Sequence, residues 1–73
     1  MYTFVIHYAD GSKLECKHIV SAIYNDNGAR RTASGEEIAK TVFSVGKDMW
    51  LKSQAGSYSI SGSSVRMIEV KVE

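Results

Sequence analysis

The first eighteen residues predict a β-hairpin, and this hairpin constrains the fold more than any other stretch of the chain. Aromatic and aliphatic side chains occupy every second position from Tyr2 to Tyr8, and a second alternating stretch runs from Lys13 to His18. A period of two is typical of strands that bury one face. Asp10 and Gly11 lie between the two stretches and form a strong turn signal.

The length of the turn decides which side chains of the hairpin lie opposite each other. A two-residue turn would place Ile6 opposite Glu15, whereas a three-residue loop places Ile6 opposite Leu14. Because a slip of one residue moves every side chain to the other face, the buried face favours the three-residue loop. Gly11 would then take a positive φ as the residue after a type I turn. The predicted pairs are Tyr8 with Ser12, Ile6 with Leu14, Phe4 with Cys16, and Tyr2 with His18.

Short β-branched and aromatic stretches, separated by glycine and serine turns, predict further strands along the rest of the chain. A change of phase between Lys17 and Val20 predicts a bulge, and a similar change predicts another near Met67 and Ile68. Ser34 followed by Glu37 matches a capping box and predicts a single helical turn near residues 35–40. The further strands are expected at residues 19–24, 29–32, 41–45, 48–52, 57–61 and 65–72.

These elements predict one all-β domain over residues 1–73. We expect an antiparallel meander of six to seven short strands that forms a small barrel or a two-layer sandwich. The first ten residues carry no positively charged stretch, so we expect no secretory signal, and no apolar run reaches membrane-spanning length. Cys16 is the single cysteine, which excludes an intramolecular disulfide and fits a reducing cytoplasm.

Cys16 and His18 share one strand face and are the natural candidates for metal binding or covalent catalysis. A zinc site needs four ligands, and His7, the only other histidine, points to the opposite face in the predicted register. A cysteine nucleophile needs an orienting group and an oxyanion hole, and the sequence offers no such constellation. We therefore expect a buried thiol opposite Phe4, no metal, no cofactor and no enzymatic activity.

Trp50 is the most informative single residue for function. In the stretch Met49-Trp50-Leu51, either Met49 and Leu51 line the core and Trp50 lies outside, or the reverse holds. Both alternatives leave a large apolar side chain to be covered, and an exposed Trp is often an anchor for a protein partner. In residues 57–61, serines alternate with Tyr58 and Ile60, which leaves a flat uncharged face that a second chain could extend if the strand lies at an edge.

The resulting prediction is a non-enzymatic cytoplasmic domain for protein interaction or self-association, with a homodimer as the simplest assembly. The expected contact residues are Met49, Trp50, Leu51, Tyr58 and Ile60. The alternative is a small nucleic-acid-binding barrel that combines basic side chains with stacking aromatics. A net charge of +1 disfavours this alternative. Its contact residues would be Lys13, Lys17, Tyr24, Arg30 and Arg31.

Overall fold

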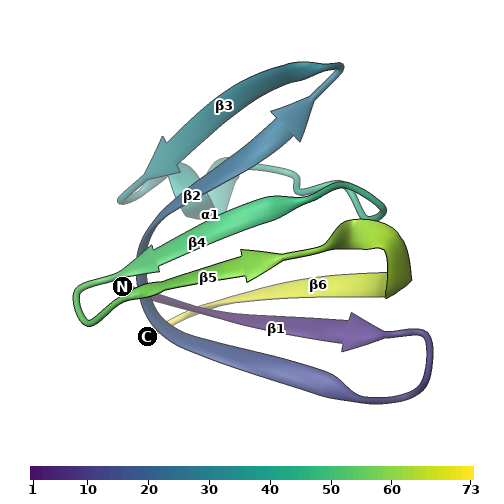
Figure 1. Ribbon diagram of the computed structural model, residues 1–73. Coiled ribbons are helices and arrows are strands. Elements are labelled where there is room, and N and C mark those ends of the chain that lie inside the picture. Colours follow the sequence, from purple (N-terminus) through teal and green to yellow (C-terminus); the bar gives the residue numbers. More distant parts are fainter.

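The computed structural model describes residues 1–73 and contains one antiparallel sheet of six strands (Figure 1). A short helix and a 3₁₀ turn interrupt the strands. The all-β antiparallel prediction is confirmed. The elements are β1 (Tyr2–Tyr8), β2 (Lys13–Asp26), β3 (Ala29–Ser34), α1 (Glu37–Lys40), β4 (Met49–Ser53), β5 (Ser57–Ile60), η1 (Gly62–Ser64) and β6 (Val65–Val72).

The long strand β2 organises the sheet, because its two halves pair with different neighbours. Its first half pairs with β1, and its second half lies between β3 and β4. The strand order is β5-β4-β2-β1-β6, with β3 also pairing with β2. The sheet curls, as Figure 1 shows, but it is not closed, since β5 pairs only with β4 and β6 pairs only with β1.

Two bulges change the phase of β2 at the bend. The first is at His18, which has a φ of 60°, so Lys17 and His18 together oppose Thr3. The second is at Val20, where the register against β4 shifts. The sequence predicts one inserted residue between Lys17 and Val20, and the structure has two. The second insertion returns the even-numbered residues to the core face, where Ala22 is fully buried.

The three-residue loop predicted for the first hairpin is confirmed. Ile6 pairs with Leu14, Phe4 pairs with Cys16, and Gly11 has a φ of 91°. The predicted pairing of Tyr2 with His18 is wrong. Tyr2 pairs with Ile19 because the bulge at His18 inserts one residue before the end of the ladder.

The prediction of a strand at residues 41–45 is wrong, because this segment is a loop between α1 and β4. Phe43 turns into the core and makes edge-to-face contacts with Phe4 and Tyr24, at centroid distances of 5.3 Å and 5.2 Å. Val42 beside it is 88% exposed. These β-branched and aromatic residues have strand propensity, but a strand also needs a neighbouring strand to pair with.

The single helical turn is confirmed as α1, whose Ile38 is fully buried. Glu37 accepts a hydrogen bond from the Ser34 backbone N–H at 3.0 Å, which is one half of the predicted capping box. The bulge in β6 falls at Arg66, one residue before the position expected from the sequence.

The core lies on the concave side of the sheet and draws on every element except η1. Phe4, Ile6, Ile19, Ile38 and Leu51 are its largest fully buried side chains, together with Cys16. No side-chain nitrogen or oxygen is buried without a hydrogen-bond partner.

Candidate functional site

The structure decides the alternatives at Trp50. Met49 and Leu51 are 2% and 0% exposed and line the core, so Trp50 lies on the outer face of the sheet, where it is half-buried. Its neighbours in the ladder are Ile23 on β2 and Ser59 on β5. Ile23 in turn pairs with Thr32 on β3. One row of side chains therefore crosses four strands, with two large apolar residues at its centre and a hydroxyl at each end.

The next row along the same strands is polar throughout. It consists of Ser34, Ser21, Lys52 and Ser57, paired in that order across β3, β2, β4 and β5. Lys52 is the only charged residue in the two rows. We call these two rows, together with Arg30, the Trp50 face.

Arg30 extends from β3 over the indole of Trp50. Its guanidinium carbon lies 4.6 Å from the ring centroid, which is within the range of a cation–π interaction. Arg31, the next residue, points away and pairs with Asp26 at 2.9 Å between Nε and Oδ2. Arg30 therefore contacts Trp50, whereas Arg31 forms an ion pair with Asp26, and only Arg30 belongs to the Trp50 face.

The other predicted contact residues are distributed between the core and its margin. Ile60 is 4% exposed and lies in the core with Met49 and Leu51, so these three side chains support the sheet from within and do not reach a partner. Tyr58 is half-buried on the core side of β5, opposite Leu51. Only Trp50 among the five lies on the outer face.

The basic residues of the nucleic-acid alternative do not gather on one surface. Lys13 begins β2, whereas Arg30 and Arg31 lie opposite the last residues of β2. Lys17 pairs with Glu15 at 3.4 Å. Tyr24 packs edge-to-face against Phe43 as part of the core, so its ring is not free to stack on a base.

Cys16, His7 and His18 do not form a common site. Cys16 is fully buried, and its burial raises the pKa of the thiol, which disfavours the reactive thiolate. His7 hydrogen-bonds Glu69 on β6, and this bond is the main cause of a lowered pKa of the Glu69 carboxyl. No group of three or more His, Cys, Asp or Glu side chains is arranged to hold a metal ion.

His18 is bound to Glu73, a contact that the sequence did not indicate. The Glu73 carboxylate accepts hydrogen bonds from the Thr3 hydroxyl at 2.7 Å and from the His18 backbone N–H at 2.7 Å. It also lies 2.9 Å from His18 Nδ1. These bonds lower the pKa of Glu73 to about 2, with the Thr3 bond the largest cause. Glu73 lies 70 positions from Thr3 and 55 positions from His18 in the chain, so no local pattern could reveal these contacts.

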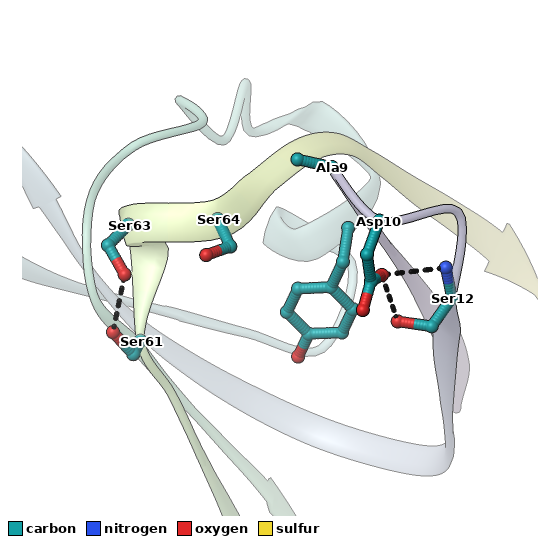
Figure 2. A pocket seen from close by; sticks show the side chains of 7 residues that line it. Ala9, Asp10, Ser12, Ser61, Ser63 and Ser64 are labelled. Carbon is teal, nitrogen blue, oxygen red and sulfur yellow. Dashed lines mark hydrogen bonds between the residues drawn. The ribbon is translucent and has the colours of Figure 1, made fainter.

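A hydroxyl-lined hollow of ≈480 Å³ lies between the β1–β2 turn and η1. Figure 2 shows Asp10 and Ser12 on one side and three serines on the other: Ser61, Ser63 and Ser64. Asp10 Oδ1 accepts hydrogen bonds from the Ser12 hydroxyl at 2.6 Å and from the Ser12 N–H at 2.9 Å. The Ser12 hydroxyl bond is the main cause of a lowered pKa of Asp10. This carboxylate therefore braces the turn.

A second hollow, of ≈450 Å³, lies at the other end of the sheet beside His18 and Tyr58. Its remaining lining residues are Met1, Lys17, Ser53, Gln54 and Ala55. The Ser53 hydroxyl is engaged with the backbone of its own turn, where it bonds to Gly56. The only histidine of this hollow, His18, already has a carboxylate partner in Glu73.

Comparison with protein families, with curated proteins and with solved structures finds no match for this chain. None of its helices has the length and apolar character needed to cross a membrane. The Trp50 face is the most distinctive part of the surface of the domain.

Proposed function

We propose that this protein is a non-enzymatic cytoplasmic interaction domain that binds a protein partner through the Trp50 face. The observation that supports this proposal is the position of Trp50 on the outer face of the six-stranded sheet, where it is half-buried and lies 4.6 Å from the guanidinium carbon of Arg30. Trp and Arg are the residue types that most often dominate the energy of protein interfaces.

The surroundings of Trp50 also suit a protein partner. Ile23 extends the apolar centre, while Ser59 and Thr32 form a small hydroxyl border in the same row. An apolar centre within a polar rim is the usual composition of a protein interface. Lys52 is the only acid or base in the two rows, so a partner would not have to desolvate many charges there.

The test is capture of partners on the immobilised domain, with three variants compared. We expect Trp50→Ala to reduce binding of the retained protein by about thirtyfold, since truncation of a central Trp typically costs about 2 kcal/mol or more. Arg30→Ala should weaken the same protein's binding, because it removes the group that holds the indole. Ser44→Ala, at an exposed position in the loop between α1 and β4 and outside the Trp50 face, is the control and should leave binding unchanged.

The outcome that contradicts this proposal is equal retention of partners by Trp50→Ala and by the unchanged protein. Each variant is first checked by thermal unfolding, so that loss of the fold is not mistaken for loss of binding. Retention on a nucleic-acid column that falls steeply with added salt would favour the alternative of a nucleic-acid-binding domain.

A further inference from the structure

The outer edge of β6 is the longest unpaired strand edge in the fold. β6 has eight residues and pairs only with β1, whereas the other edge strands, β3 and β5, have six and four. The N–H of Glu73 donates to the carbonyl of Met1 at 3.1 Å, and bonded pairs alternate along an antiparallel ladder. The odd-numbered residues of β6 therefore bond to β1, and the backbone groups of Ile68, Val70 and Val72 point outward.

This edge has a bulge at Arg66 and charged side chains at Glu69 and Lys71, but it lacks two other guards against a second strand. Proteins guard such edges with proline or with short, covered strands. The chain has no proline, and no strand covers this side of β6, although the short helix α1 packs against β6. Val72 is 74% exposed and Met67 is 47% exposed, while Ile68 and Val70 are only half-buried.

We propose that a second copy of this chain pairs with this edge, with the two β6 strands antiparallel about a twofold axis at Val70. In this register Glu69 lies opposite Lys71 of the second copy, and the same pair occurs again across the axis. Ile68 lies opposite Val72 of the second copy on the core side. Both kinds of cross-strand pair stabilise antiparallel sheets.

The charges of β6 select this register over its neighbours. An axis at Glu69 or at Lys71 would place two like charges directly opposite each other, which is unfavourable. An axis at Ile68 would place Glu69 opposite Met67 and leave both Glu69 and Lys71 without a charged partner in the second copy. An axis between two residues would set core-side residues opposite outer-side ones. Only the axis at Val70 places both Glu69 and Lys71 opposite a residue of the opposite charge.

The directions of the backbone N–H and C=O groups in β6 also fit an axis at Val70. Val70 has its N–H and C=O directed away from β1, so two copies of Val70 can exchange both bonds across the axis. The Glu69–Lys71 pair then falls at a non-bonded position, where opposing side chains come closest. By contrast, β3 contains two arginines and no acid and cannot pair charges with itself.

This inference goes beyond the proposed function, because the β6 edge and the Trp50 face are different surfaces. The experiment is sedimentation equilibrium at several protein concentrations. We expect the unchanged protein to dimerise, and Lys71→Glu to weaken the dimer by about tenfold or more, since it sets Glu69 opposite a glutamate twice. Glu69→Lys should weaken it for the same reason.

An equimolar mixture of Lys71→Glu and Glu69→Lys should restore the dimer, because each variant then offers the charge that the other lacks. Lys47→Glu, an exposed site in the turn before β4 with the same change of net charge, is the control and should dimerise normally. A strict monomer at high concentration, a dimer unaffected by Lys71→Glu, or a mixture that stays monomeric would each overturn the inference. A dimer lost in Trp50→Ala but kept in Lys71→Glu would instead assign self-association to the Trp50 face.

Discussion

Replacing Phe43 by leucine tests how the loop between α1 and β4 completes the core. Phe43 packs edge-to-face against Phe4 and Tyr24, with interplanar angles of 70° and 73°. Leucine keeps most of the apolar volume at this position and removes both aromatic contacts. Each such contact contributes about 0.5–1.5 kcal/mol beyond its buried area, so the expected loss in the free energy of unfolding is about 1–3 kcal/mol.

A loss of this size is large for a chain of 73 residues. Typical domains have a free energy of unfolding of about 0.05–0.15 kcal/mol per residue, which corresponds to about 4–11 kcal/mol for this length. With a urea slope of about 1 kcal/mol per M, Phe43→Leu should lower the denaturation midpoint by about 1–3 M. The measurement is equilibrium urea unfolding followed by Trp50 fluorescence.

The neighbouring residue supplies the control for this experiment. Val42 is 88% exposed, so Val42→Ala should change the midpoint by less than about 0.5 M. If residues 41–45 formed a strand, Val42 and Phe43 would lie on opposite faces and both could be partly buried. A midpoint that is unchanged in Phe43→Leu, or that falls equally in Val42→Ala, would refute the reasoning.

Three further predictions concern single residues. The pKa of Glu73 is lowered from 4.5 to about 2 in the folded protein, so its charge stabilises the fold above pH 4.5 and this contribution is lost as the pH falls toward 2. The difference in melting temperature between the unchanged protein and Glu73→Gln should therefore shrink over that range, and a constant difference would contradict the role of the charge. Gly62→Ala should destabilise the fold by about 1–3 kcal/mol in urea unfolding, because a Cβ at Gly62 would overlap the backbone of Lys47. Cys16 should react with a thiol reagent only at the rate of opening of the fold, and a rapid reaction in native buffer would show that the thiol is accessible.

Local patterns in the sequence predict most of the strands and the regions of their bulges, but not how many residues are inserted at the bend of β2. The first hairpin was predictable because the alternation of two adjacent stretches allows only one register with a common apolar face. The bounds of β6 were predicted to the residue for the same reason. The second bulge of β2 was not predictable, since it depends on how Ala22 and Tyr24 meet the core after the bend at His18.

The Trp50 face was predicted only as one of two alternatives. Alternation in the stretch Met49-Trp50-Leu51 shows that two faces exist, but it does not say which is buried. The tertiary structure decides this, because β4 pairs with both β2 and β5 in a register that sets Met49 beside Ile60 in the core. The stacking of Arg30 on Trp50 depends on the β2–β3 hairpin and is likewise absent from any local pattern.

The sequence by itself determined the class of fold, the register of the first hairpin and the burial of Cys16. Each of these depends on residues close together in the chain, where periodicity and turn chemistry act directly. Only the tertiary structure decided that residues 41–45 form a loop, that Glu73 binds His18, and that the outer edge of β6 stays unpaired. The physical reason is that pairing, burial and charge contacts between distant segments depend on which edges and faces the folded chain leaves available.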